Sequence, residues 1–453
     1  MMRFISDFHL HSRYSRATSS QMDLENLAYW AKIKGIKILG TGDFTHPEWF
    51  KEIKEKLEEK EKGLYKLKEN QLKSLPFVSF EKQKNSFYSS FEKQKDSFYI
   101  LDIDEIRFIL TSEISCIYSK KGKTRKIHLI IFAPNIETGA KINTQLSWRF
   151  NLKADGRPIL GIDAKELIKI ILDISDNCFI VPSHAYTPWF SLFGSKSGFD
   201  SIEECFEEYS EYIYSIETGL SSSPDMSWRN EALDNTTLIS NSDAHSLMKL
   251  GREANIFEGE EINYDFIIKA IKRDVPEKEI PLKLISTVEF FPEEGKYHFD
   301  GHRLCKIRLS PKEREKYGGI CPHCGKPLTI GVLSRIEKLA TRKEGEKPNK
   351  ALSFLNLVPL VEIIAEAFSQ TSFSKTTLEE YQKLINNFGS EFEILINTPI
   401  DFLSKISSRV AEGIRKVRSG EIELIPGYDG EYGKVKIFSK NEEKPKVSQK
   451  TLF

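Results

Sequence analysis

The sequence predicts an α/β protein followed by a small zinc-binding module and a C-terminal, mostly helical domain. Three observations lead to this prediction. Short apolar segments alternate with helical patterns in the first part of the chain, a group of cysteines follows them, and segments with helical periodicity come last. The length of 453 residues also exceeds that of one ordinary domain.

Seven short apolar segments of the first part are predicted to be strands. They are Arg3–Phe8, Ile36–Gly40, Arg107–Ser112, Lys126–Phe132, Cys178–Pro182, Tyr212–Ile216 and Thr237–Ser240. A helix is expected between the first two, because Ser20 and Asp23 fit a capping box and Gly35 provides a stop. A second helix is expected over Asp163–Ile174, with Asp163 as its N-cap.

A polar stretch at residues 51–99 interrupts this alternation. Its first part, Lys51–Lys68, is dense in lysine and glutamate, which favours a solvent-exposed helix. The sequence SFEKQKNSFY at Ser79–Tyr88 then recurs as SFEKQKDSFY at Ser90–Tyr99. Since two copies are too few for a repeat architecture, we interpret the stretch as a surface insertion without a catalytic role.

Changes in composition suggest the domain boundaries. We expect a catalytic domain at residues 1–295, a zinc module at 296–340, a helical domain at 341–440 and a flexible tail at 441–453. The polar segment Thr341–Lys350 is typical of a flexible linker. Helices are expected within Leu352–Phe368, Thr377–Phe388 and Ile400–Arg418.

The overall composition excludes several classes of protein. The hydrophobic fraction of 40% is typical of a soluble globular chain. Lysine plus arginine and aspartate plus glutamate both number 66, which excludes a uniformly basic coat for nucleic acid but allows a local basic face. We find no membrane-spanning run and no signal peptide, so we expect no membrane partner and a cytoplasmic, nucleoid-associated location.

Many of the predicted strands end in residue types that can bind metals. The first is followed by His9 and His11, which are two residues apart and therefore point to one face of an extended chain. Later strands carry or precede Asp43, His46, Glu113, His128, His184, Glu217, Asp243 and His245. In an α/β barrel, the carboxyl ends of the strands meet at one mouth, so these groups would share cations there.

This ligand chemistry suits Zn²⁺, Mn²⁺ or Fe²⁺, since it combines imidazoles and carboxylates without thiolates. A carboxylate such as Glu113 can bridge two metals, and two-metal sites activate water for phosphoryl displacement. Phosphoester hydrolysis is therefore the expected reaction class. The predicted catalytic residues are Glu113, Glu217, Asp243 and His245.

The motifs HLH, TGD, SE, IH, PSH and SDAH together resemble the PHP (polymerase and histidinol phosphatase) superfamily. The resemblance implies a distorted (β/α)7 barrel with a multinuclear metal site. It implies one metal at His9, His11, Glu113 and Asp243, a second at Glu113, His128 and His184, and a third at His245. The places where many relatives carry two further histidines for the third metal hold Phe44 and the region of Ala17. Asp43 or His46 can substitute there, or Asp43 can orient an imidazole instead.

The cysteine group has the spacing of a structural zinc site. His302, Cys305, Cys321 and Cys324 form the pattern His-x2-Cys-x15-Cys-x2-Cys. His298 and Asp300 are alternative fourth ligands. We therefore expect Zn²⁺ in this module and in the barrel, with Mg²⁺ or Mn²⁺ as further candidates for catalysis.

The segment KYGGICPHCGKPLTIGVLSRIEKLA and the ending IPGYDGEYGKVKIF extend the resemblance. Together with the barrel motifs they resemble the endonuclease Q family of DNA-repair nucleases. This resemblance implies hydrolysis of the phosphodiester 5′ of deaminated bases (uracil, hypoxanthine or xanthine) or of abasic sites. Two rival interpretations are a small-molecule phosphomonoesterase of the histidinol-phosphatase kind and a non-catalytic DNA-binding scaffold.

Aromatic and basic residues near the strand ends are candidate DNA contacts. Tyr186, Trp189 and Phe190 could stack on an extruded base, although ordinary loop packing is slightly favoured, because exposed Trp and Phe side chains are costly. Arg229 and Arg335 could contact phosphates. At the C-terminus, Gln449, Leu452 and Phe453 resemble a sliding-clamp (PCNA) binding peptide, with a frayed terminus as the alternative.

Overall fold

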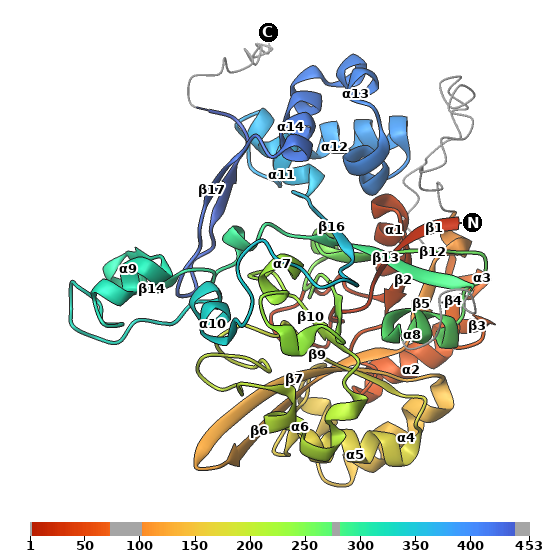
Figure 1. Cartoon of the computed structure of the whole chain (residues 1–453). Coiled ribbons are helices and arrows are strands. Elements are labelled where there is room, and N and C mark those ends of the chain that lie inside the picture. The colour runs from red at the N-terminus through yellow and green to blue at the C-terminus, as the bar shows by residue number, and fades with distance from the viewer. Residues whose placement is uncertain (1, 73–101, 274–280, 440–453) are drawn as a thin grey trace.

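Three hydrogen-bonded sheets surround a common centre (Figure 1). The largest sheet has the order β16-β13-β12-β1-β2-β5-β4-β3. Its strands are β1 (Met2–Asp7), β2 (Ile36–Gly40), β3 (Leu57–Glu61), β4 (Leu64–Leu67), β5 (Arg107–Ile109), β12 (Ala254–Gly259), β13 (Leu282–Glu289) and β16 (Ser353–Asn356). The computed structural model describes residues 2–72, 102–273 and 281–439.

The other two sheets complete the surround. One has the order β8-β6-β7-β9 and the other pairs β10 with β11. Their strands are β6 (Thr111–Lys120), β7 (Lys123–Phe132), β8 (Ile159–Leu160), β9 (Phe179–Pro182), β10 (Ser215–Glu217) and β11 (Thr237–Ile239). The pairs β1–β2, β2–β5 and β10–β11 are parallel, whereas β7 runs antiparallel to both β6 and β9.

Three junctions connect these sheets around the centre. β5 continues into β6 through Leu110, and β9 lies beside β10. At the third junction, the side chain of Asn255 on β12 accepts the backbone N–H of Ser240 and donates back to its carbonyl, at 3.0 and 2.7 Å. These two bonds take the place of strand pairing between β11 and β12. With all three junctions closed, the sheets enclose a common centre, which is faced by the ends of β1, β2, β6, β9, β10 and β11.

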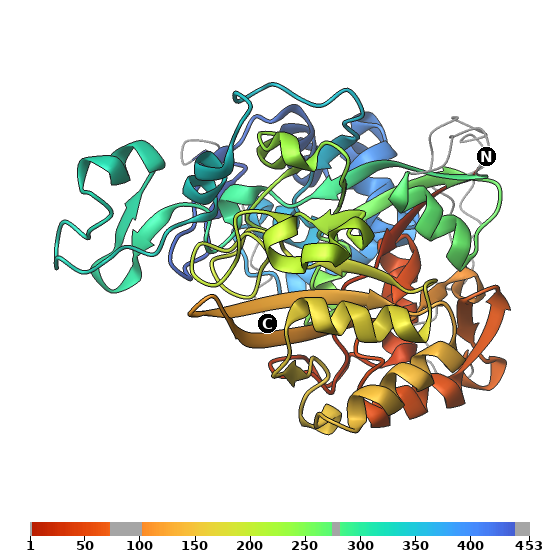
Figure 2. The same cartoon turned by 60° about the horizontal axis from the view of Figure 1, so that its bottom comes forward.

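Helices surround this centre on the outside (Figures 1 and 2). They are α1 (Leu24–Lys34), α2 (Pro47–Lys56), α3 (Glu69–Leu72), α4 (Ile136–Ser147), α5 (Ala164–Ile174), α6 (Ile202–Phe206), α7 (Pro224–Ser227) and α8 (Tyr264–Lys272). Asp163 caps α5 as predicted. The predicted capping box before α1 is wrong in detail: Asp23 itself is the N-cap and accepts the N–H of Asn26, while Gly35 ends the helix with a φ of 87°.

Each predicted strand corresponds to an observed one: Ile36–Gly40 has its predicted ends, Arg107–Ser112 is divided between β5 and β6, and the others have shifted ends. The stretch after residue 51 differs from the prediction. α2 ends at Lys56, and the next residues form the β3–β4 hairpin rather than a solvent-exposed helix. β4 pairs with β5, and Leu64 and Tyr65 are buried. Leucines spaced along Leu57–Leu67 therefore anchor this segment in the main sheet. The duplicated sequence at 79–99 lies outside the described residues.

The cysteine module projects from one side of the molecule (Figure 1). It contains β14 (Asp300–His302), β15 (Ile307–Leu309), α9 (Pro311–Lys316) and α10 (Val332–Leu339). The segment Thr341–Lys350, which was predicted to be a flexible linker, is anchored at its start. The N–H groups of Thr341 and Arg342 donate to the carbonyl of Arg229, and Arg342 bonds both oxygens of Asp234.

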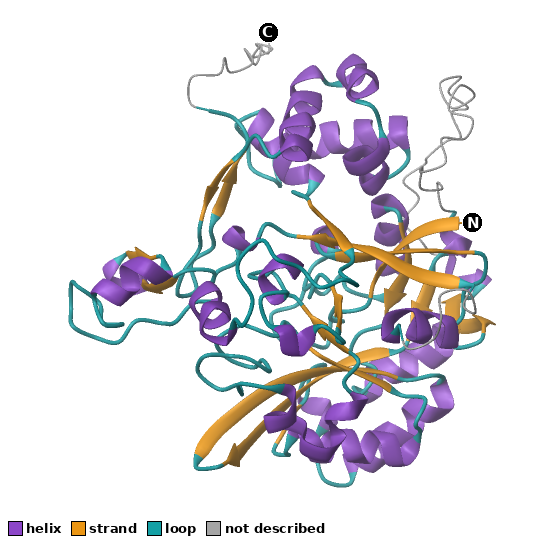
Figure 3. Ribbon diagram, in the orientation of Figure 1, coloured by secondary structure: helices purple, strands orange, loops and turns teal. Residues whose placement is uncertain are grey.

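The C-terminal part is mostly helical (Figure 3). It contains α11 (Leu360–Ala367), α12 (Lys375–Phe388), α13 (Ile400–Ile406) and α14 (Ser408–Ser419), followed by the hairpin of β17 (Glu423–Ile425) and β18 (Lys434–Lys436). The helix expected over Leu352–Phe368 begins instead as β16, which pairs with β13, and the helix expected over Ile400–Arg418 is broken at Ser407. No helix in the described ranges is long and apolar enough to span a membrane.

Candidate metal centre

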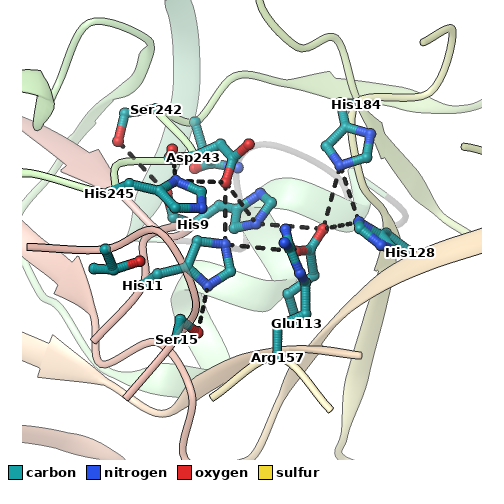
Figure 4. Close-up of polar contacts among 12 residues, drawn as sticks. His9, His11, Ser15, Glu113, His128, Arg157, His184, Ser242, Asp243 and His245 are labelled. Atoms are coloured by element: carbon teal, nitrogen blue, oxygen red, sulfur yellow. Dashed lines mark hydrogen bonds and ion pairs between the residues drawn. The ribbon is translucent and has the colours of Figure 1, made fainter. Parts of the chain in front are cut away.

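His9 and His11 enter the centre just after β1 (Figure 4). Each imidazole turns its Nδ1 toward a buried carboxylate: His9 Nδ1 lies 3.0 Å from Glu217 Oε1, and His11 Nδ1 lies 3.1 Å from Asp43 Oδ1. Both Nε2 atoms therefore face inward. This pattern, in which a carboxylate orients the far nitrogen, is common behind metal-binding histidines.

Glu113 lies between two groups of histidines (Figure 4). Its Oε1 is 2.9 Å from His128 Nδ1 and 3.3 Å from His184 Nε2. Its Oε2 is 3.5 Å from His11 Nε2. Glu113 is on β6 and His128 is on the neighbouring β7, so the hairpin brings both into the centre. One carboxylate thus faces both sides of the site.

Asp243 completes the group on the side of the first two histidines. Its Oδ1 is 3.0 Å from His11 Nε2 and 3.7 Å from His9 Nε2. Its backbone is in the left-handed region, with a φ of 46°, and that of His184 has a φ of 30°. Non-glycine residues seldom adopt this conformation, and it is concentrated at functional sites.

Two sets of ligand atoms result, and they share Glu113. The first consists of His9, His11, Glu113 and Asp243, and the second of Glu113, His128 and His184; within each set the candidate atoms lie within 4.8 Å of one another. These are the residues that the resemblance to the PHP superfamily implies for the first two metals. Their function as ligands stays a prediction.

The chemistry of the group fits divalent cations. His9 Nε2 and Glu113 Oε1 are buried, and neither makes a hydrogen bond of good geometry, although Glu113 Oε1 lies 2.9 Å from His128 Nδ1. Buried polar atoms without a well-formed hydrogen bond are costly, and a shared cation would satisfy both of them. Burial lowers the pKa of His128 to about 4, which keeps this imidazole neutral and able to bind a metal.

The electrostatics of the centre are dominated by close opposite charges. Burial opposes ionisation of Glu113, but His128, His9 and Arg157 outweigh it and hold the pKa of this carboxyl well below its usual range. Burial likewise opposes protonation of His11, but Asp43 and Asp243 raise its pKa to about 10. The group therefore favours bound positive charge, which protons or metal ions can supply.

Asp43 is not placed as a metal ligand. Its second oxygen accepts bonds from the backbone and side chain of Ser12, at 2.6 and 2.7 Å, and from Ser15 at 2.9 Å. These contacts and its bond to His11 match the alternative in which Asp43 orients an imidazole. His46 lies apart as the N-cap of α2, stacked on Tyr14.

His245 lies at the edge of the first set. Its ring is 4.5 Å from that of His11, and its Nδ1 is 2.9 Å from the carbonyl of Asp243. In the described part of the chain it does not join a group of three or more candidate ligands. The third metal implied by the resemblance therefore has one candidate ligand, His245, because Phe44 is an apolar residue buried in the core.

Glu217, which the sequence analysis names as a catalytic candidate, is buried on the Nδ1 side of His9. Glu217 is 1% exposed, and its oxygens are used by His9, by the backbone N–H of His184 at 2.8 Å and by Asn241 at 2.9 Å. The residue lies behind the ligand group and does not face the open side. Glu217 is thus a positioning residue that fixes His9 and His184.

Arg157 is a site residue that the sequence did not predict. Its Nη1 lies 3.1 Å from Glu113 Oε2, and its side chain is 27% exposed (Figure 4). The loop is held close by Gly156, whose N–H donates to the Tyr14 carbonyl and where a Cβ would come within 2.4 Å of Asp43. No motif marks Arg157, since it precedes only the two-residue strand β8.

The predicted aromatic contacts separate into exposed and buried side chains. Tyr186 is 2% exposed and packs on Phe193, with ring centroids 5.1 Å apart, so it is a core residue. Phe190 is half-buried and covers His128 at 4.7 Å. Trp189 is 36% exposed and contacts Tyr297. Of the three, Trp189 is the one that solvent reaches most readily.

The two predicted basic contacts are less accessible than expected. Arg335 is buried and donates to the carbonyls of Phe193 and Phe199 and to Asp200, so its guanidinium holds the loop rather than DNA. Arg229 is half-buried, and its carbonyl anchors the segment after α10. The predicted clamp-binding residues Gln449, Leu452 and Phe453 lie outside the described residues.

The cysteine module gathers the predicted ligands. His302, Cys305, Cys321 and Cys324 offer ligand atoms that lie within 4.8 Å of one another. Burial opposes ionisation of Cys321, but the N–H groups of Cys324 and His323 lower its pKa to about 7. The thiolate needed for a metal is therefore accessible at neutral pH. The alternative ligands are used elsewhere: His298 faces the carbonyl of Ser221, and Asp300 accepts from Gly331 and Ser334.

Comparison with known proteins extends these observations. Residues 359–421 match the family model described as MJ0043 C-terminal domain. The chain is 38% identical over 259 residues to the MJ0043 protein of Methanocaldococcus jannaschii, a match that covers 56% of this chain and 31% of that protein. It is 28% identical over 313 residues to YqxK of Bacillus subtilis, which covers 68% of this chain and 74% of that protein. The match thus spans less than a third of the length of the first relative.

Two crystal structures match nearly the whole chain. One is the lesion-specific endonuclease PfuEndoQ of Pyrococcus furiosus, with a TM-score of 0.78, 28% identity and coverage of 96% of this chain and 95% of that one. The other is endonuclease Q in complex with a 27-mer duplex substrate with an abasic lesion at the active site. Its TM-score is 0.80 and its identity 27%, with coverage of 98% and 99%.

The fold and the side-chain groups define an α/β protein with a candidate His, Glu and Asp metal centre and a separate candidate Cys and His centre. Over nearly its whole length this protein has the fold of endonuclease Q, which confirms the resemblance predicted from the sequence.

Proposed function

We propose that this protein is a metal-dependent DNA endonuclease that cuts the phosphodiester 5′ of a deaminated base (uracil, hypoxanthine or xanthine) or of an abasic site. The observation that carries the proposal is the likeness, over nearly the full length of both chains, to endonuclease Q crystallised with an abasic-lesion duplex. The shared carboxylate of Glu113 between two sets of candidate ligands supports it.

The proposal includes the finer architecture. We infer that the strands around the centre form a distorted (β/α)7 barrel of the PHP type within residues 1–295, with the zinc module at 296–340 and the helical domain at 341–440, from which β16 adds an outer strand to the large sheet. Metals bound by the two sets would supply an activated water and charge neutralisation for an in-line displacement at phosphorus. Zn²⁺, Mg²⁺ and Mn²⁺ are the candidates, and Zn²⁺ is proposed for the cysteine group.

The protein's own side chains prepare the site for this reaction. Glu217 and Asp43 hold the imidazoles of His9 and His11 in one orientation, so that both Nε2 atoms are available. Arg157 is positively charged beside Glu113, and its exposed part can hold a phosphate oxygen. These groups are fixed before substrate arrives, which is the arrangement that stabilises developing charge most effectively.

His245 is the proposed proton-transfer group. Its Nδ1 can only donate to the carbonyl of Asp243, because a carbonyl oxygen has no proton, so its Nε2 carries the free electron pair. Burial lowers the pKa of His245, which keeps this electron pair available at neutral pH. With 26% of its side chain exposed, His245 can meet substrate at the open edge.

A damaged nucleotide would have to leave the duplex to bring its phosphate into this centre. Extrusion costs least where the base is mismatched or missing, which favours uracil, hypoxanthine and abasic positions over intact pairs. The partly exposed Trp189 precedes Phe190, whose ring packs on His128, and is a candidate for contact with the extruded nucleotide.

The direct test uses end-labelled duplexes with one uracil, one hypoxanthine, one abasic site or no lesion. Each is incubated with Mg²⁺, Mn²⁺ or Zn²⁺, and the nick is mapped. A cut on the 5′ side of the lesion alone is expected. Equal cutting of the intact duplex would contradict lesion specificity. Turnover of small phosphomonoesters without a nick would favour the histidinol-phosphatase-like alternative instead.

A further inference from the structure

A groove lies at the end of α4, outside the metal centre. It has a volume of about 650 Å³, and its walls include Asn143, Thr144, Trp148, Arg149, Phe150 and Lys153. Trp148 is 73% exposed, which is unusual for the largest aromatic side chain. An indole held at the surface in this way is typical of a binding contact.

The charge of the groove favours a polyanion. Arg149 and Lys153 are exposed, and neither makes an ion pair among the residues that the structure describes. None of the lining residues carries a carboxylate, although acidic and basic residues are equally numerous in the whole chain. Arg149 instead lies over the ring of Phe150, at 5.4 Å. An aromatic face beside unpaired cations is the combination that binds nucleic-acid strands.

The groove is connected to the metal centre by a short, fixed piece of chain. Lys153 and Arg157 are four positions apart in the chain, so their Cα atoms lie at most about 14 Å apart. Asp155 holds this piece by accepting the N–H groups of Arg16 and Arg157, and Gly156 donates to Tyr14. Arg157 then reaches Glu113. A span of at most about 14 Å corresponds to no more than about four nucleotides of one strand.

We propose that this groove holds the DNA strand that runs on from the scissile phosphate, with a base stacked on Trp148 and phosphates at Arg149 and Lys153. The inference rests on the proposed function, because it takes the metal centre as the point where the strand is cut. The groove would anchor the strand a few nucleotides from the cut, independently of the lesion.

The test measures binding of a fluorescein-labelled duplex with one abasic site, in an Asp243→Ala background so that binding is separated from cutting. We expect Trp148→Ala to weaken binding by about 5-fold or more, as loss of a stacked base does. The double variant Arg149→Ser/Lys153→Ser should weaken it similarly and lower the slope of log K against log salt by about 2.

Two matched variants serve as controls. Phe373→Ala removes an aromatic side chain that is 77% exposed on the helical domain, and Lys141→Ser removes an exposed cation of α4 that pairs with Glu137. Both should leave binding unchanged. Equal weakening by the controls and the groove variants would overturn the inference.

The outcomes also separate this inference from the proposed function. If the wild-type protein nicks lesion duplexes while the groove variants bind like their parent, the inference is wrong and the proposed function stands. If the wild-type protein neither nicks nor binds such duplexes, both are wrong. The melting temperature of each variant is also measured. A value equal to that of the wild-type protein ensures that a loss of binding comes from the groove and not from unfolding.

Discussion

The carboxylate of Glu217 lies 3.0 Å from His9 Nδ1, and both side chains are 1% exposed. This contact fixes which nitrogen of His9 faces the candidate metal group. We expect Glu217→Gln to lower metal affinity and cleavage by about 10- to 100-fold, because the imidazole loses its orientation and basicity. Elemental analysis after dialysis and a cleavage assay would measure both. Glu203→Gln, at an exposed position of α6, is the control, and an unchanged metal content in Glu217→Gln would contradict the assignment.

Arg157 should affect the rate of the reaction more than it affects metal binding. The substitution Arg157→Ala removes a positive charge beside Glu113 and should lower kcat by about 100-fold, the size typical of a lost group that stabilises the transition state. Metal content should stay near the wild-type value, since the ligand sets do not include Arg157. Single-turnover kinetics with elemental analysis would separate the two effects. If Arg157→Ala lost metal but kept the wild-type kcat per bound metal, Arg157 would only hold Glu113 in place and would not act on the substrate.

Asp243 should be needed for DNA cleavage and not for DNA binding. Its Oδ1 approaches both His9 and His11, so Asp243→Ala removes a candidate ligand of the first set. We expect no detectable nick and DNA affinity within about 3-fold of wild type, measured by fluorescence anisotropy. Asp173→Ala, on the exposed end of α5, is the control. Retained cleavage in Asp243→Ala would falsify the metal assignment.

A buried ion pair joins the helical domain to α1. Lys34 Nζ lies 2.7 Å from Glu391 Oε2, and both side chains are almost fully buried. Replacement of Lys34 by methionine leaves the carboxylate buried without its cation, which should lower the free energy of unfolding by about 3 kcal/mol. Urea denaturation would measure this change. Lys51→Met, at an exposed pair 4.0 Å long, should change the stability by about 0.5 kcal/mol or less.

Glu289 should make stability depend on pH. Burial raises its pKa to about 8, against 4.5 in the unfolded chain, despite bonds from Thr287 and Thr218. The folded state therefore holds a proton that the unfolded state releases, and this stability is present below pH 4.5 and lost as the pH rises to about 8. The slope is at most about 1.4 kcal/mol per pH unit.

Urea denaturation at pH 5.5 and pH 8 would test this dependence. The loss of stability between the two values should be smaller in Glu289→Gln than in the wild-type protein, because the amide does not titrate. Glu260→Gln, at an exposed position, should keep the wild-type dependence. Parallel curves for the wild-type protein and Glu289→Gln would show that Glu289 is ionised in the fold.

The sequence predicted the ligand group because its chemistry is local to strand ends. His9 and His11 share a face by their spacing, and Glu113, His184 and Asp243 each follow or begin a recognisable apolar segment. The exact functions of Asp43 and Glu217 were not predictable. A carboxylate on the Nδ1 side of an imidazole orients the ring, and one on the Nε2 side can share its metal, but both have the same sequence signature. Only the packing of separate strands decides between them.

Other features depended on contacts that a single sequence does not carry. The apolar run around Leu352–Leu357 suits a strand or a helix equally, and pairing with β13 decided in favour of a strand. Arg157 has no motif, because its function comes from a loop folded against Tyr14 and Asp43. Arg335 was expected at a surface, but carbonyls of a distant loop hold its guanidinium.

The pairing of β16 with β13 has a consequence for dividing this protein into fragments. Residues beyond the cysteine module supply β16, the outermost strand of the large sheet, so this sheet is completed by a later part of the chain. A truncation after residue 340 would uncover the amide and carbonyl groups along one side of β13. Such a bare strand is prone to self-association, and a shortened version of this protein would be expected to aggregate even with every metal ligand in place.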